Sequence, residues 1–182
     1  MTTFYMDGIQ HTIEEGSTWR NFVEKELLPE GIWLYEDEDT YFKVTDYYYN
    51  NVIGVYVNWN VKDANLNNVL LDDVIKNGDI IYANGDITFY YEDMEYYAIN
   101  GMTWSNLQDW RGIINPHYCE ELFGCDQNNN MSGWVARQED IEGGWCIGQS
   151  GYVFINNDDN TRVKCDDIII PEHHYKAEIV YQ

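Results

Sequence analysis

Gly16-Ser17-Thr18-Trp19 is the stretch that decides the fold, and it returns 85 residues later as Gly101-Met102-Thr103-Trp104. Each copy follows a Phe-Tyr pair at the same spacing, which is Phe4-Tyr5 in the first case and Phe89-Tyr90 in the second. Asn21 and Asn106 also match at this offset. The pattern indicates that one structural unit occurs twice.

A second pair of segments closes the two units. Asp72-Asp73-Val74-Ile75 is matched by Asp166-Asp167-Ile168-Ile169 at an offset of 94 residues. The second unit is therefore longer by about nine residues between these landmarks. We predict two domains, residues 1–85 and residues 86–182, with an insertion in the second at about 115–150.

The first unit opens with a predicted β-hairpin over residues 3–14. Asp7-Gly8 is a strong two-residue turn signal between two strand-like segments. Gly16 then ends the second strand, and Thr18 is the predicted helix N-cap. Four apolar side chains at helical spacing are expected on the buried face of this helix: Trp19, Phe22, Val23 and Leu27.

The second unit repeats this order. A hairpin is predicted from segments 87–91 and 95–99, with Glu92-Asp93 in place of the Asp-Gly turn. A helix is predicted from Thr103, with Trp104, Leu107 and Trp110 facing inward.

The remaining segments are rich in β-branched and aromatic residues and predict further strands. In the first unit these are 32–35, 41–44, 52–61 and 79–83, with Tyr47-Tyr48-Tyr49 in a loop. In the second they are 152–155, 168–170 and 175–181. The predicted fold class is α+β, in the form of two tandem β-grasp-like ββαββ repeats with one short helix each.

The strongly negative charge of the chain bears on which partners it can bind. The 182 residues include 32 Asp and Glu but only 10 Lys and Arg, which gives a net charge of −22. The acidic excess occurs in both units, and 16% of the residues are aromatic, so the chain is predicted to fold rather than to be an acidic tail. Such a surface repels phosphate backbones and attracts basic clefts, so no direct nucleic-acid binding is expected.

Targeting signals and cysteines bear on location. The first residues have no basic segment followed by an apolar one, and no apolar run approaches the length of a membrane span. We therefore expect no membrane association and a cytoplasmic location in a bacterial host. All four cysteines lie in the second unit, and reduced thiols are the default expectation.

Several residues are of types that bind metals or catalyse reactions. His117, Cys119, Cys125, Cys146 and Cys165 are zinc-ligand types, but their spacing lacks a Cys-x-x-Cys pair. Cys119 or Cys146 with His117 could form a nucleophile and its base, yet such combinations arise by chance in any chain of this length. We expect no enzymatic activity, no cofactor and no metal site.

The acidic and tyrosine-rich surface remains as the candidate partner-binding region. A carboxylate track of this kind can mimic phosphates, and neighbouring tyrosines can anchor an interface. The alternative is a solvated acidic face with no partner. The predicted partner-binding residues are Glu36, Asp37, Glu38, Asp39, Asp46, Tyr47, Tyr48, Glu92, Asp93, Glu139 and Asp140.

The repeated motif resembles small modules found in phage and prophage proteins of gut bacteria. The matching residues are Phe4, Asp7, Gly8, Gly16, Thr18, Trp19, Asp73, Val74 and Ile75 in the first copy, and Phe89, Gly101, Thr103, Trp104, Asp167, Ile168 and Ile169 in the second. The resemblance implies a phage setting and no enzymatic activity. In its overall character the chain is also similar to anti-CRISPR proteins, several of which fill the nucleic-acid channel of an effector nuclease with acidic surface.

These observations predict a non-enzymatic, phage-encoded acidic inhibitor that binds a basic nucleic-acid-handling protein, above all a CRISPR effector nuclease. The alternative is a structural or assembly module of a virion or tail.

Overall fold

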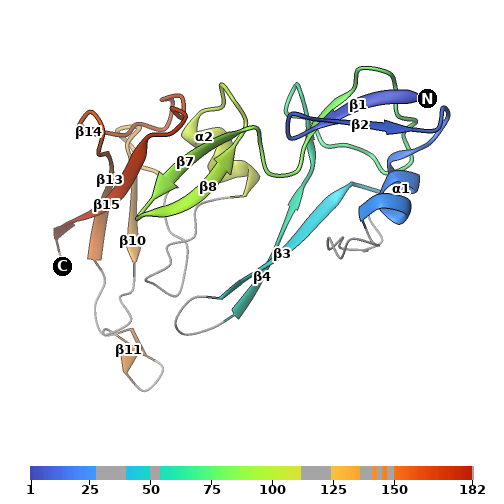
Figure 1. Cartoon of the computed structure of the whole chain (residues 1–182). Helices are drawn as coiled ribbons and strands as arrows, with labels where there is room; N and C mark the ends of the chain where they lie inside the picture. The colour runs from blue at the N-terminus through green and yellow to red at the C-terminus, as the bar shows by residue number, and fades with distance from the viewer. Residues whose placement is uncertain are drawn as a thin grey trace. The chain divides into compact units, whose positions relative to one another are not determined.

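The protein was analysed as a computed structural model, which describes residues 1–27, 40–49, 54–111, 124–135, 141–142, 145–146 and 150–181. The chain divides into two compact units. Unit 1 comprises Met1–Tyr48 and Val55–Asp86, and unit 2 comprises Tyr49–Gly54 and Ile87–Gln182. Strands dominate, and the α-helices are short, so the fold class is α+β as predicted (Figure 1).

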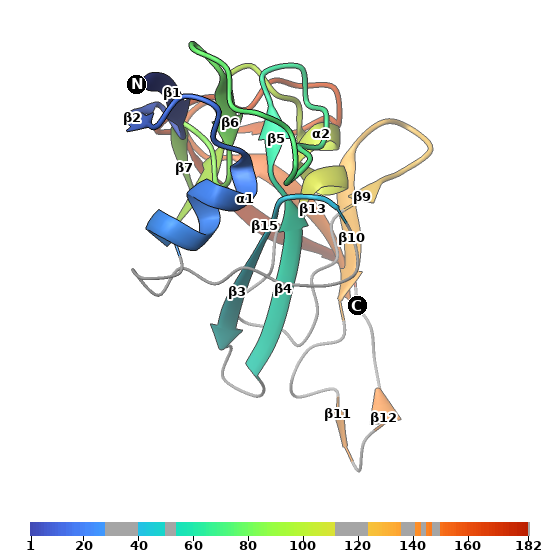
Figure 2. The same cartoon turned by 90° about the vertical axis from the view of Figure 1, so that its right-hand side faces the viewer.

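Unit 1 is built on a four-stranded mixed sheet in the order β2-β1-β6-β5. Strand β1 pairs in parallel with β6, and the other neighbours are antiparallel. Strands β3 and β4 form a separate antiparallel pair, which Figure 2 shows as a long hairpin. The elements are β1 (Thr2–Met6), β2 (Ile9–Ile13), α1 (Trp19–Phe22), the π-helical turn η1 (Val23–Leu27), β3 (Lys43–Tyr49), β4 (Gly54–Asn60), β5 (Lys62–Asp63) and β6 (Ile80–Tyr82).

Unit 2 contains a seven-stranded sheet in the order β8-β7-β15-β13-β10-β9, with β14 paired to β13. Here β7 and β15 form the parallel pair. Strands β11 and β12 pair only with each other. The elements are β7 (Ile87–Tyr91), β8 (Met94–Ala98), α2 (Trp104–Trp110), β9 (Gly124–Cys125), β10 (Met131–Val135), β11 (Ile141–Glu142), β12 (Trp145–Cys146), β13 (Ser150–Asn156), β14 (Thr161–Arg162) and β15 (His174–Tyr181).

Both predicted hairpins are confirmed. In the first turn, Asp7 and Gly8 have φ of 53° and 81°, and in the second, Glu92 and Asp93 have φ of 48° and 64°. Two successive left-handed residues produce the twist that a two-residue hairpin needs. Glycine adopts this conformation without steric cost, whereas Glu92 and Asp93 adopt it with side chains attached.

Both predicted helix starts are also confirmed. The Thr18 and Thr103 side chains each accept the backbone N–H three residues later, at 3.3 Å from Asn21 and 3.1 Å from Asn106. Each asparagine Oδ1 in turn accepts its threonine's backbone N–H, which completes a reciprocal capping box. The repeated sequence thus codes for the same helix start twice.

The helix of unit 1 is anchored by aromatic packing on the sheet. Trp19 and Phe22 meet the ring of Phe4 edge-on, with centroids 5.1 and 5.0 Å apart. The four residues predicted for the buried helix face are all buried. In unit 2, Trp104 contacts Phe89, Phe154 and Tyr175 in the same edge-on manner. Trp19 and Trp104 therefore each stand at the centre of a core.

Two local predictions were wrong. Tyr47-Tyr48-Tyr49, predicted as a loop, lies within β3, because pairing with β4 continues through these residues. Residues 168–170, predicted as a strand, contribute only an isolated bridge between Ile168 and Thr103. The backbone N–H of Ile169 instead donates to Met102 at 3.1 Å, which holds this segment against the start of α2. The predicted strand over residues 32–35 lies outside the described residues.

Candidate functional site

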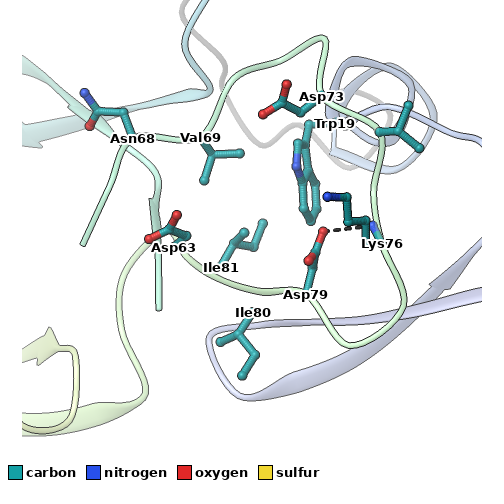
Figure 3. Close-up of a pocket in the computed structure, with 10 residues that line it drawn as sticks. Trp19, Asp63, Asn68, Val69, Asp73, Lys76, Asp79, Ile80 and Ile81 are labelled. Atoms are coloured by element: carbon teal, nitrogen blue, oxygen red, sulfur yellow. Dashed lines mark hydrogen bonds between the residues drawn. The ribbon is translucent and has the colours of Figure 1, made fainter. Parts of the chain in front are cut away.

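A cavity of about 400 Å³ opens in unit 1 beside the first residue of α1 (Figure 3). Its surface combines apolar side chains with a larger share of polar groups, which are mostly acidic. The lining residues are Trp19, Asp63, Asn68, Val69, Asp73, Val74, Lys76, Asp79, Ile80 and Ile81. The volume lies within the range of small ligand sites, about 300–1,000 Å³.

The repeated motif itself builds one side of this cavity. Thr18 forms an isolated bridge with Val74, and the backbone N–H of Trp19 donates to the carbonyl oxygen of Asp73 at 3.2 Å. The N–H of Ile75 donates to Ser17 at 2.8 Å and adds a third tie. These bonds hold the Asp-Asp-Val-Ile landmark against the start of the helix.

Two of the three cavity carboxylates are fixed by backbone amides. Oδ1 of Asp63 accepts the N–H groups of Asn65 and Asn67 at 2.8 and 3.0 Å. Oδ2 of Asp79 accepts the N–H of Lys76 at 2.8 Å, the bond drawn in Figure 3. The second oxygen of each carboxylate has no hydrogen-bond partner in the described part of the chain, so it remains available to a ligand.

Charge in the cavity is uneven. Asp63, Asp73 and Asp79 contribute three carboxylates, and Lys76 contributes one ammonium group. Within the described ranges, the Asp73 carboxylate has neither a hydrogen bond nor an ion pair. The site therefore favours a positively charged ligand.

An exposed ion pair lies next to the cavity residues in sequence. The guanidinium of Arg20 meets the Asp72 carboxylate through two hydrogen bonds, at 2.8 Å from Nε and 3.3 Å from Nη2. The Arg20 hydrogen bond lowers the pKa of Asp72 below its usual value. Asp72 is thus already partnered, unlike its neighbour Asp73.

The second unit has diverged at the corresponding positions. In unit 1, Asp63 is the strand partner of Ile81. In unit 2, the strand partner of Tyr175, which corresponds to Ile81, is Asn156, so an amide replaces the carboxylate at this position. At the offset of 94 residues, His173 stands in place of Asp79. Asp167, the counterpart of Asp73, accepts the N–H of Lys164 at 2.9 Å and is not free in the same way. The acidic character of the cavity is therefore a property of unit 1.

The predicted partner-binding residues lie in several segments. Glu36, Asp37, Glu38, Asp39, Glu139 and Asp140 lie outside the described residues. Asp46, Tyr47 and Tyr48 lie on β3, whose backbone alone is described at these positions. Asp93 is exposed at the β7–β8 turn. The part of this set that the structure describes is not gathered into one site.

Glu92 has a structural contact that its sequence position does not reveal. One of its carboxylate oxygens accepts the backbone N–H of Ala177 at 2.9 Å. Asp7, its counterpart in unit 1, accepts the N–H of Ala83 at the same distance. Both acids therefore join a hairpin turn to the strand that runs parallel to it. A role of Glu92 in partner binding stays a prediction.

The cysteines correct one expectation. Cys125 and Cys165 form a disulfide across 40 residues of sequence, so the default of reduced thiols is wrong for this pair. Its closure also removes two thiolates from the zinc-ligand candidates. Cys119 and His117 lie outside the described residues. Within the described ranges, no cluster of three or more His, Cys, Asp or Glu residues is arranged to hold a metal ion.

Sequence reasoning missed the cavity around Trp19. Asp63, Asp73 and Asp79 are separated along the chain, and only the closing landmark marked one of them in advance. No protein-family model, curated protein or solved structure matches the chain. None of the helices in the described residues has the length and apolar composition that crossing a membrane requires.

Proposed function

We propose that the chain is a non-enzymatic, phage-encoded acidic protein that binds and inhibits a basic nucleic-acid-handling protein, with a CRISPR effector nuclease as the first partner to test. One observation carries this proposal. With 32 Asp and Glu against 10 Lys and Arg, at least 22 carboxylates have no basic counterpart within the chain. This charge belongs to a folded, aromatic-rich protein.

The distribution of charge supports the same proposal. Acidic residues are in excess in both halves of the sequence, so the field comes from the whole chain and not from a terminal tail. A field of this kind speeds association with a basic cleft and opposes binding to nucleic acid itself. The proposed place of action is the cytoplasm of the bacterial host.

The β-grasp assignment of each unit is part of the proposal. In unit 1 the helix follows the first hairpin, and β1 lies in the sheet between β2 and the parallel strand β6. Unit 2 repeats this arrangement with β8, β7 and β15. We propose that the two units are diverged copies of one β-grasp-like module.

The experiment is a binding and cleavage assay with a purified, guide-loaded effector nuclease. We expect binding at about 50 mM salt that weakens at least about tenfold by about 300 mM, because exposed charges are screened. DNA cleavage should fall as binding saturates. Full cleavage at large molar excess of the acidic protein would refute inhibition of that effector.

A matched pair of variants separates a local contact from total charge. In the first variant, Glu36 and Glu38 are replaced by Gln, and Asp37 and Asp39 by Asn. In the control variant, four exposed glutamates are replaced by Gln: Glu14, Glu15, Glu24 and Glu26. Both lose four negative charges. Weaker binding of the first variant alone would locate the interface, whereas equal weakening would indicate a general field effect.

A second function is favoured by the Cys125–Cys165 disulfide. Disulfides persist on virion and cell surfaces and are rare in a reducing cytoplasm. This favours the alternative of a structural or assembly module of a virion or tail. Mass spectrometry of purified particles, with alkylation of free thiols, tests it: the disulfide-linked peptide should be recovered from particles, and absence of the protein from them would count against this role.

A further inference from the structure

We propose that the cavity of unit 1 is a subsite for one arginine side chain presented by a peptide segment of the partner protein. The Asp63, Asp73 and Asp79 carboxylates would receive the guanidinium, and the indole N–H of Trp19 would donate to a carbonyl oxygen of the same segment. This inference rests on the proposed function, because it names the part of a basic partner that the cavity takes.

The three carboxylates of the cavity favour a positively charged ligand that is larger than a metal ion. Three carboxylates line the cavity, yet they do not form a cluster that could hold a metal ion within the described part of the chain. A compact cation therefore cannot use them together. The guanidinium group is planar and carries five donors, so a single group can hydrogen-bond with more than one carboxylate.

The indole N–H of Trp19 is a hydrogen-bond donor at the cavity that a ligand can use. Trp19 is only 3% exposed, and its indole nitrogen has no hydrogen-bond partner among the described residues. In Figure 3 the ring stands between Asp73 and Asp79, with its nitrogen-bearing edge on the side of Val69. The indole nitrogen itself is not fully buried, since it does not belong to the fully buried side-chain polar atoms that lack a hydrogen bond among the described residues. Its N–H can therefore donate to an acceptor that a ligand brings into the cavity.

The walls suit the apolar part of an arginine side chain. Val69 and Ile81 are buried core residues that face the cavity, and Ile80 is exposed at its edge. The methylene groups of arginine pack on apolar surface while the charged end contacts polar groups. One peptide residue thus matches the two kinds of polar group and the apolar walls together.

The residues of unit 2 that correspond to the cavity differ in charge, which limits the proposed arginine site to unit 1. The counterparts of Asp63 and Asp79 are Asn156 and His173, so the second unit lacks most of the carboxylates that would bind a guanidinium. The proposal therefore assigns arginine binding to unit 1 alone.

The test is a titration of the full chain with N-acetyl-arginine methylamide, followed by NMR at the indole N–H of Trp19. The cross-peak is assigned with Trp19→Phe, and N-acetyl-norleucine methylamide serves as the uncharged probe. We expect a saturable shift with a Kd in the range of about 1 mM. Asp73→Asn should weaken binding about threefold, and Asp166→Asn, which removes one exposed charge in unit 2, should leave it unchanged.

Three results would overturn the proposal: no saturable shift, an equal response to the norleucine probe, or equal weakening by Asp73→Asn and Asp166→Asn. The outcome is separable from that of the proposed function. Arginine-amide binding without effector binding would refute the function and leave the subsite standing. Effector binding that Asp73→Asn does not weaken would refute the subsite as part of that interface.

Discussion

Replacing Asp7 with alanine tests how the hairpin of unit 1 is joined to the parallel strand. The Asp7 carboxylate accepts three backbone N–H groups, from Ala83 at 2.9 Å, Asn84 at 3.1 Å and Gly85 at 2.9 Å. The amides of Ala83 and Gly85 are partly buried, whereas that of Asn84 is exposed and can bind water after the substitution. Two amides therefore lose their acceptor.

The expected cost follows from these two bonds. A hydrogen bond to a charged group contributes about 1.5–3 kcal/mol, so the lower value for two of them gives about 3 kcal/mol. Alanine also tolerates the left-handed conformation of this position, with φ of 53°, less well than aspartate does. We therefore expect Asp7→Ala to lower the free energy of unfolding of unit 1 by at least about 3 kcal/mol.

The assay must report on one unit, because a chain with two units need not unfold in one step. Native-state hydrogen exchange at the Tyr5 amide, which donates to the backbone carbonyl oxygen of Asp79 at 2.8 Å, reports on the β1–β6 pairing. Exchange should be faster by about 100-fold in Asp7→Ala. The matched change Glu92→Ala removes the single acceptor of the Ala177 N–H. Exchange at the Tyr90 amide, which donates to the carbonyl oxygen of His173 at 3.0 Å, should therefore rise only about tenfold. An increase below about fivefold at Tyr5 would refute the reasoning.

Three further predictions concern stability. Thr18→Ala should lower the free energy of unfolding of unit 1 by about 1 kcal/mol, measured by hydrogen exchange, because the capping box is lost. Thr18→Ser keeps the hydroxyl group and should stay close to wild type. An equal loss of stability in both variants would contradict the capping account. Reduction of Cys125–Cys165 should destabilise unit 2 by about 4 kcal/mol for a loop of this length, measured by urea unfolding with and without reductant, and an unchanged midpoint would show that the bridge does not restrain the unfolded chain. A hydrogen bond from the backbone N–H of Asn130 lowers the pKa of Asp126, and one from the backbone N–H of His174 lowers the pKa of Asp158. Both folded pKa values lie below the unfolded one, so the two carboxylates stabilise the folded state above about pH 4, and this stabilisation is lost as the pH falls through the folded values. Unit 2 should therefore unfold at a lower urea concentration at pH 3 than at pH 7. Asp126→Asn should reduce that difference.

Several elements could be predicted from the sequence because their causes are local. The turn at Asp7-Gly8 depends on two adjacent residues, and the helix start at Thr18 depends on a hydrogen bond across three. The buried helix face follows from the spacing of apolar side chains. These interactions occur within a few residues of sequence, so the repeated motif specifies them twice without reference to the rest of the chain.

The tertiary structure decided the features that join distant segments. The disulfide closes 40 residues, and the Asp7 carboxylate meets amides more than 70 residues away. The cavity combines residues from α1, β5, β6 and the segment between them, and no local pattern brings Asp63 near Trp19. The sequence by itself therefore determined the repeated turn, cap and helix, together with the net negative charge. Only the pairing of β1 with β6 and the packing of the helix determined where those charges surround a cavity, because such contacts depend on chain segments that the sequence separates.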